Sequence, residues 1–125
     1  MPDLAPVDQR LRAIFTPYRD RFSLRENEQG LIVELPGYEG QPWGYVAGTR
    51  LGKRYVSFYL MSVYAQPGLL DGISPGLRRR MQGKSCFNFT TVNEALLGEL
   101  KALTARAIQG HADAVGPVLQ RAKRR

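Results

Sequence analysis

The chain has little cysteine, little histidine and no long apolar run. Its 125 residues include one cysteine, Cys86, and one histidine, His111. A single cysteine cannot form a disulfide within the chain, which is typical of proteins from a reducing compartment. No apolar stretch approaches the roughly 20 residues of a membrane-spanning helix, and the first residues, MPDLAPVDQR, lack the basic and apolar regions of a secretory signal. We therefore expect a cytoplasmic protein with no membrane segment.

Several common kinds of functional site are also missing from the sequence. One Cys and one His, without C-x-x-C or H-x-x-x-H spacing, cannot supply the ligands of a standard structural zinc site. The glycine-rich stretch GYEGQPWGYVAG matches neither of the two common phosphate-loop spacings. A cysteine nucleophile usually needs a base, and His111 is far from Cys86 along the chain. The sequence thus predicts no cofactor, no metal site and no enzymatic activity.

The composition is that of one folded domain with an excess of positive charge. Hydrophobic residues form 43% of the chain and charged residues 23%, and a length of 125 residues fits one domain of about 100–150 residues. The formal net charge of +7 comes from 18 Lys and Arg against 11 Asp and Glu. Four of these basic residues lie within positions 121–125, where we expect a solvated tail. We predict a single domain over residues 1–125, with at most weak, salt-sensitive binding to nucleic acid.

Hydrophobic periodicity predicts helices near both ends of the chain and strands between them. The first helix begins near Pro6 and carries apolar residues at helical spacing. FSLRENEQGLIVELPGY predicts a hairpin, and WGYVAGTRLGKRYVSFYLMSVY predicts two further strands that join near Gly52 and Lys53. Thr91 and Glu94 match a capping box at the start of a long helix. The predicted buried stripe of that helix comprises Val92, Leu96, Leu100, Leu103 and Ala107.

Between the central strands and the long helix, ISPGLRRRMQG predicts a helix and KSCFNF predicts a short strand. Ser74 is the expected cap of the helix, Pro75 its first residue and Gly83 the residue just past its end. Leu77 and Met81, four residues apart, are its expected buried contacts. Because successive hairpins form antiparallel sheets, the predicted fold is α+β: a two-layer sandwich of an antiparallel sheet packed against N- and C-terminal helices.

Alternation along KSCFNF divides the predicted sheet into two faces. Lys84, Cys86 and Asn88 share one face, whereas Phe87 and Phe89 share the other. We expect the face with the phenylalanines to meet the helices. On the polar face, Cys86 is either a small buried residue or part of a ligand pocket. In a pocket, Lys84 could lower the pKa of the thiol.

Aromatic residues of the two central strands complete the candidate site. Trp43, Tyr45, Tyr55 and Tyr59 occupy alternating positions, and a suitable register would place them on the face that carries Cys86. Such residues are either packed in the core or, since Tyr and Trp carry polar groups, form the wall of a ligand pocket. The predicted ligand-binding residues are Trp43, Tyr45, Tyr55, Tyr59, Arg80, Lys84, Cys86 and Asn88.

One part of the sequence also resembles a known family. The stretch KRYVSFYLMSVYAQPGLLDGISPGLRRRMQGKSCFNF, followed by a capped helix with ELKALT, is similar to the YdhG-like domain family of small bacterial proteins. The resemblance covers residues 53–105 and implies a two-layer α+β fold with an antiparallel sheet. Tyr59 departs from the pattern, because many relatives have a histidine there. The matching positions are Arg80, Gly83, Lys84, Ser85, Cys86 and Asn88.

The resemblance implies a second possible function, since some YdhG-like proteins are described as frataxin-like iron chaperones. Iron delivery of that kind relies on carboxylate ligands. The first helix region offers Asp3, Asp8 and Asp20, in a basic protein. We predict a non-enzymatic domain that binds a small ligand or a protein partner on one sheet face. The alternatives are an iron chaperone and a weak nucleic-acid-binding protein.

Overall fold

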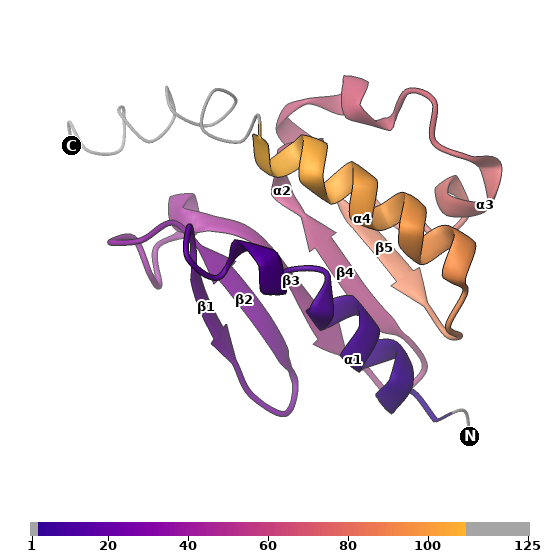
Figure 1. Cartoon of the computed structure of the whole chain (residues 1–125), viewed down its shortest axis with the longest axis horizontal. Coiled ribbons are helices and arrows are strands. Elements are labelled where there is room, and N and C mark those ends of the chain that lie inside the picture. Colours follow the sequence, from indigo (N-terminus) through magenta and orange to yellow (C-terminus); the bar gives the residue numbers. More distant parts are fainter. Residues whose placement is uncertain (1–2, 110–125) are drawn as a thin grey trace.

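The chain forms one antiparallel sheet in which the five strands lie in the same order as in the sequence (Figure 1). The structure, a computed structural model, describes residues 3–109. His111 and the predicted basic tail at 121–125 lie outside them. Every strand is antiparallel to its neighbours. The strands are β1 (Ser23–Glu26), β2 (Gly30–Glu34), β3 (Tyr45–Leu51), β4 (Val56–Leu60) and β5 (Cys86–Phe89).

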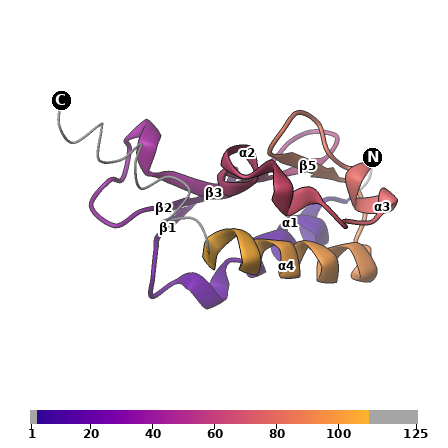
Figure 2. The same ribbon diagram turned by 90° about the horizontal axis from the view of Figure 1, so that it is seen from above.

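Two longer helices form a second layer on one face of this sheet (Figures 1 and 2). They are α1 (Ala5–Ala13), which begins with Pro6 in its first turn as predicted, and α4 (Glu94–Gln109). The predicted two-layer α+β fold with N- and C-terminal helices is therefore confirmed. Within the described residues, no helix combines the length and apolar character needed to cross a membrane. The shorter elements are η1 (Thr16–Tyr18), η2 (Pro42–Gly44), α2 (Met61–Ala65), η3 (Pro67–Leu70) and α3 (Pro75–Arg78).

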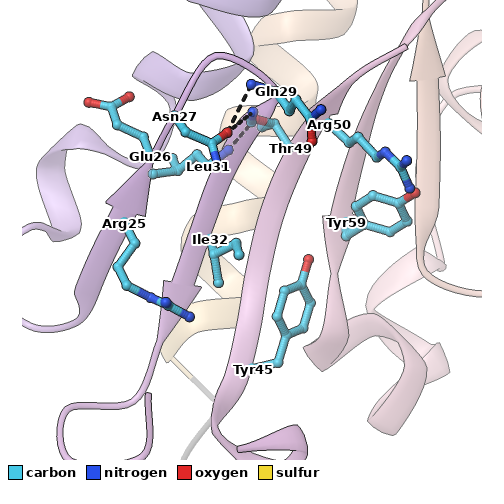
Figure 3. A pocket seen from close by; sticks show the side chains of 11 residues that line it. Arg25, Glu26, Asn27, Gln29, Leu31, Ile32, Tyr45, Thr49, Arg50 and Tyr59 are labelled. Atoms are coloured by element: carbon cyan, nitrogen blue, oxygen red, sulfur yellow. Dashed lines mark hydrogen bonds between the residues drawn. The ribbon is translucent and has the colours of Figure 1, made fainter. Parts of the chain in front are cut away.

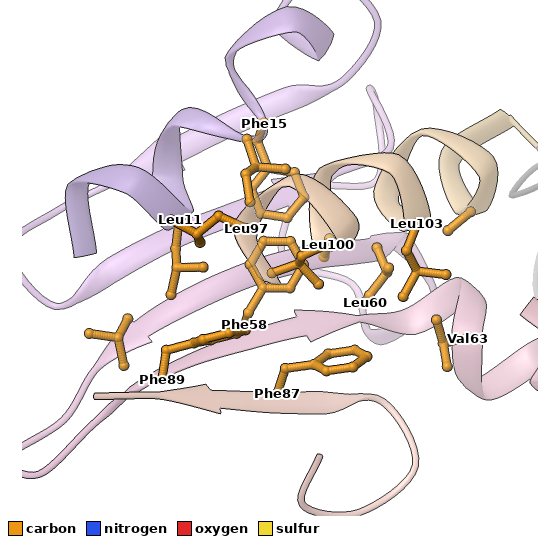
Figure 4. Packing of buried hydrophobic residues seen from close by; sticks show 14 of the residues in the cluster. Leu11, Phe15, Phe58, Leu60, Val63, Phe87, Phe89, Leu97, Leu100 and Leu103 are labelled. Atoms are coloured by element: carbon orange, nitrogen blue, oxygen red, sulfur yellow. The ribbon is translucent and has the colours of Figure 1, made fainter. Parts of the chain in front are cut away.

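The apolar core lies between the two helices and one face of the sheet (Figure 4). Phe58 of β4 stacks on Phe15, with ring centroids 4.9 Å apart. Phe87 and Phe89 of β5 are buried on the same side of the sheet. The alternation predicted for KSCFNF is thus confirmed for its phenylalanines. Aliphatic side chains from strands and helices fill the space around these rings, among them Leu11, Leu60, Val63, Leu97, Leu100 and Leu103.

The segment between β4 and β5 differs from its predicted structure. The strand predicted to run on to Tyr64 ends at Leu60, and the chain continues as the short helix α2. Ser74 caps α3 as predicted, because its hydroxyl oxygen accepts a hydrogen bond of 3.1 Å from the N–H of Leu77. However, α3 ends at Arg78, well before Gly83.

Met81, which follows α3, lies at the edge of the sheet and not in the helix. It forms a β-bridge with Phe87, so the chain leaves the helical path to run along the outer edge of β5. Gly83 then has a positive φ of 84° and turns the chain into β5. The sequence signal at Gly83 therefore marks a turn and not a helix end.

The start of α4 also differs from the predicted capping box. The side-chain oxygen of Asn93 accepts a hydrogen bond of 3.1 Å from the N–H three residues on, so Asn93 and not Thr91 is the cap. Glu94 forms a two-pronged ion pair with Arg10 of α1. Val92 precedes the helix and is exposed, so its predicted place in the buried stripe is wrong. The other predicted members of the stripe are buried: Leu96, Leu100, Leu103 and Ala107.

Candidate ligand-binding face of the sheet

The face of the sheet opposite α1 and α4 contains a hollow of about 470 Å³ (Figure 3). Strands β2, β3 and β4 form its floor. The side chains of Ile32, Tyr45, Arg50 and Tyr59 line it, and Arg25 of β1 lies at one side. We call the surface made by these five residues the open face.

A row of paired residues crosses all five strands on the face that contains this hollow. Arg25 lies opposite Ile32, Ile32 opposite Gly48, Gly48 opposite Tyr59, and Tyr59 opposite Cys86. Residues that are directly opposite in a sheet project from the same face. Because the central member of the row is a glycine, the row leaves space over Gly48 for the Tyr45 hydroxyl.

A shift of register places Tyr45 on the open face. The pairing of β2 with β3 shifts next to Glu34, so that Tyr45 lies opposite Glu34. The Tyr45 ring then extends over Gly48, where an added Cβ would come within 2.8 Å of the phenol oxygen. Burial raises the pKa of the Tyr45 hydroxyl, and neighbouring Tyr59 and Cys86 act in the same direction. Tyr45 therefore presents a neutral hydroxyl at neutral pH.

Unpaired positive charge gathers at the end of the open face near the β3–β4 turn. A second hollow, of about 670 Å³, adjoins the first and shares Arg50 with it. Lys53 and Arg54 also line this second hollow. None of these three residues forms an ion pair with another residue in the described part of the chain. We call Arg50, Lys53 and Arg54 the cationic end.

The charge of Arg25, on the other side of the open face, is neutralised. Its Nε donates a hydrogen bond of 2.7 Å to Oε1 of Glu34, and the N–H of Gly40 donates one of 2.7 Å to Oε2. Glu34 is buried, yet its pKa is lowered, because the hydrogen bond from Arg25 outweighs the effect of burial. Arg25 and Glu34 thus stabilise the β1–β2 hairpin as a pair.

Next to the open face, the β4 and β5 strands carry a polar network organised by Asn88. The side-chain oxygen of Asn88 accepts hydrogen bonds from the Ser57 hydroxyl at 2.8 Å and from the Cys86 thiol at 3.4 Å. Its amide nitrogen donates to the side chain of Gln82 at 2.7 Å. Burial raises the pKa of the Cys86 thiol, more than hydrogen bonds with Ser57 and Tyr59 lower it. These polar groups are largely satisfied within the protein.

Two of the predicted site residues, Lys84 and Arg80, lie away from the open face. Lys84 precedes β5, and its amine stands 5.7 Å from the ring centroid of Tyr64. The predicted lowering of the Cys86 pKa by Lys84 is wrong, since the pKa is raised by burial. Arg80 lines a separate hollow beside α3 and α4, and its carbonyl accepts a hydrogen bond of 2.8 Å from the N–H of Asn88.

Two of the four predicted aromatic residues lie outside the strands. Trp43 belongs to η2, which precedes β3, and Tyr55 lies in the turn just before β4. Strand alternation therefore does not relate Trp43 to Tyr45 or Tyr55 to Tyr59. Tyr55 lines the second hollow, which Tyr59 also reaches, and Tyr45 and Tyr59 come together on the open face.

The sequence interpretation missed Ile32 and Arg50, which line the hollow. Both were within reach of strand alternation, because Ile32 stands between the buried Leu31 and Val33 and Arg50 precedes the partly buried Leu51. Ile32 is 38% exposed although it is a large apolar residue. The signal in the sequence was an apolar residue at a strand position whose side chain points away from the core.

Metal-ligand side chains do not gather in the described part of the chain. Between residues 3 and 109, no three His, Cys, Asp or Glu residues lie close enough together to hold a metal ion. Asp8, one of the predicted iron ligands, is buried and pairs with Arg12 at 3.0 Å. Asp3 accepts a hydrogen bond of 3.1 Å from the N–H of Ala5.

The open face offers three kinds of contact to a bound molecule. Tyr45 and Tyr59 present aromatic rings, Ile32 presents an apolar side chain, and Arg50 presents a positive charge. Such a surface can bind and orient a molecule by packing, hydrogen bonds and charge. No family model, curated protein or solved structure matches this chain, so its resemblance to the YdhG-like family stays a prediction.

Proposed function

We propose that the protein is a non-enzymatic binding protein that holds a small ligand on the open face of its sheet. The observation that supports this most is the hollow lined by Ile32, Tyr45 and Tyr59, on the face that α1 and α4 leave uncovered. Small-molecule sites are typically concave and apolar, with a few polar groups that orient the ligand. The single cysteine supports the further proposal that the protein acts in the cytoplasm.

A small molecule fits the open face better than a protein partner does. The cores of protein interfaces are rich in exposed apolar and aromatic side chains. The large apolar side chains exposed in the described residues are Ile32, Tyr55, Tyr64 and Val92, of which Ile32 alone belongs to the open face. These four residues therefore do not form one wide apolar surface around the open face.

The contacts of Cys86 support binding in preference to covalent catalysis. A catalytic thiol is normally activated by a base or by nearby positive charge, which lowers its pKa. The pKa of Cys86 is raised instead, and the groups around its thiol are Ser57, Tyr59 and Asn88. None of these three is a base at neutral pH.

The proposal can be tested with N-phenyl-1-naphthylamine, a neutral aromatic dye that fluoresces in apolar sites. We expect the folded protein to bind the dye, and we expect Ile32→Gln to weaken binding, because Gln removes apolar contact from the hollow. Val92→Gln is the matched control, since Val92 is 39% exposed against 38% for Ile32 and does not line the hollow.

The two variants should differ in their affinity for the dye only if the open face is the binding site. Weaker binding by Ile32→Gln, with Val92→Gln unchanged, supports the proposal. Equal binding by both variants, or no binding by the folded wild-type protein, contradicts it. Thermal unfolding of each variant provides the check that both are folded during the titration.

A further inference from the structure

We propose that the ligand of the open face is a small aromatic anion. Its flat ring packs in the hollow against Ile32, Tyr45 and Tyr59, and its acidic group lies at the cationic end, next to Arg50. This inference rests on the proposed function and names the chemical class of the ligand. It follows from the unpaired positive charge at one end of the hollow and the aromatic side chains beside it.

The first part of the argument is charge. Arg50 lines both hollows, so it stands between the aromatic part of the open face and the rest of the cationic end. Lys53 and Arg54 extend the positive charge into the second hollow, which Tyr55 and Tyr59 also line. No carboxylate among the described residues pairs with any of the three basic residues. Arg25, at the other side, is already neutralised by Glu34. An anionic group therefore finds unpaired positive charge at one end only.

The second part of the argument is shape. The Tyr45 ring covers Gly48, and Tyr59 and Ile32 flank it from β4 and β2. A volume of about 470 Å³ is within the range of roughly 300–1,000 Å³ that is usual for small-molecule pockets. Flat rings gain contact area and stacking energy against aromatic side chains. Tyr45 also provides a neutral hydroxyl for a hydrogen bond.

The distribution of charge also distinguishes this ligand from single-stranded nucleic acid. Grooves that bind single strands combine aromatic side chains with positive charge along the whole path of the backbone, because every nucleotide carries a phosphate. Along these two hollows, the unpaired charge is confined to Arg50, Lys53 and Arg54, whereas the Tyr45 side has the neutral Arg25–Glu34 pair. One acidic group at one end of a ring matches this pattern better than a repeating polyanion.

Two dyes that share a ring system provide the test. The probe 1-anilinonaphthalene-8-sulfonate carries a sulfonate on the ring system of neutral N-phenyl-1-naphthylamine. We expect the anionic dye to bind the wild-type protein about tenfold or more tightly than the neutral dye, because hydrogen bonds to a charged group exceed neutral ones. We expect this preference to disappear in the triple variant Arg50→Gln, Lys53→Gln, Arg54→Gln.

A second triple variant controls for net charge. Arg19→Gln, Lys101→Gln and Arg106→Gln also remove three positive charges, from residues on the helix side that form no ion pair in the described part of the chain. This variant should keep the preference for the anionic dye. Salt provides a measurement that needs no variant, since added salt screens exposed charges and should weaken binding of the anionic dye but not of the neutral dye.

The outcomes separate this inference from the proposed function. If both dyes bind equally and Ile32→Gln weakens both, the site is real but the inference of an anionic ligand is wrong. If neither dye responds to Ile32→Gln, the proposed function fails as well. A thymidine oligonucleotide tests the remaining alternative. If it binds more tightly than the anionic dye, with an affinity that rises with its length and falls in the triple variant of the cationic end, the ligand is a nucleic acid and the inference is overturned.

Discussion

Two adjacent residues of β4, Phe58 and Tyr59, should respond very differently to replacement by alanine. Phe58 is fully buried and its ring stacks on Phe15 with centroids 4.9 Å apart. Tyr59 points to the open face and is partly exposed. The comparison keeps the strand, its neighbours and the size of the deletion nearly constant, so the difference in unfolding free energy reports which face each residue occupies.

We expect Phe58→Ala to lower the free energy of unfolding by about 3–5 kcal/mol, from lost burial and the cavity left behind. Loss of the stacked pair with Phe15 adds to the cost of the lost burial, because aromatic pairs contribute about 0.5–1.5 kcal/mol beyond the effect of their buried area. Tyr59→Ala should cost about 1 kcal/mol, near the centre of the distribution for single substitutions. The free energy of unfolding of a small domain is roughly 5–15 kcal/mol in total, so Phe58→Ala should leave the protein close to unfolding.

Urea unfolding of the three proteins measures these differences through the midpoint, provided that the slope with denaturant is unchanged. A double-mutant cycle with the milder changes Phe15→Leu and Phe58→Leu then measures the coupling between the two rings. If Tyr59→Ala proves as destabilising as Phe58→Ala, the assignment of the two faces is wrong. If the cycle gives no coupling, the two rings do not stack.

Three further predictions concern the ion pair, the helix contact and the thiol. Because Arg25 lowers the folded-state pKa of Glu34 below its ordinary value of 4.5, ionised Glu34 stabilises the fold above that pH, and this stability is lost as the pH falls through the lowered pKa. Urea unfolding between pH 7 and pH 3 should therefore show a larger loss for wild type than for Glu34→Gln, and parallel curves would refute this. Glu99→Ala removes two hydrogen bonds of 2.6 Å from Ser74 and should lower the free energy of unfolding by about 1–3 kcal/mol, whereas an unchanged urea midpoint would mean that this contact contributes nothing. Since burial raises the pKa of the Cys86 thiol, iodoacetamide at pH 8 should label the native protein about tenfold more slowly than the urea-unfolded chain, and equal rates would show that the thiol is accessible.

Strand alternation in the sequence was sufficient to predict the two faces of the sheet. It placed Phe87 and Phe89 in the core and Cys86 on the opposite face, as the strand pairing confirms. The periodicity of α4 likewise predicted four of the five members of its buried stripe. These predictions succeed because side-chain direction repeats with a fixed period along a helix or a strand, and the order of polar and apolar residues in the sequence shows that period directly.

The ends of elements were harder to predict, because several local signals compete there. Thr91 and Asn93 are both good caps, and the choice of Asn93 follows from its side-chain contact with the first turn of α4. Trp43 and Lys84 each stand two residues from a strand residue, yet both lie beyond the strand end, where alternation no longer applies. Tyr45 reached the open face through a shift of register that composition and spacing do not reveal.

The measurement that tests the open face most directly is a set of proton nuclear Overhauser effects between bound 1-anilinonaphthalene-8-sulfonate and the protein. The account predicts contacts from the dye to the methyl groups of Ile32 and to the rings of Tyr45 and Tyr59. A separate hollow between α1 and α4, lined by Ile14 and Leu97, provides the alternative location. Contacts to the methyl groups of those two residues, with none to Ile32, would contradict the assignment of the binding site to the open face.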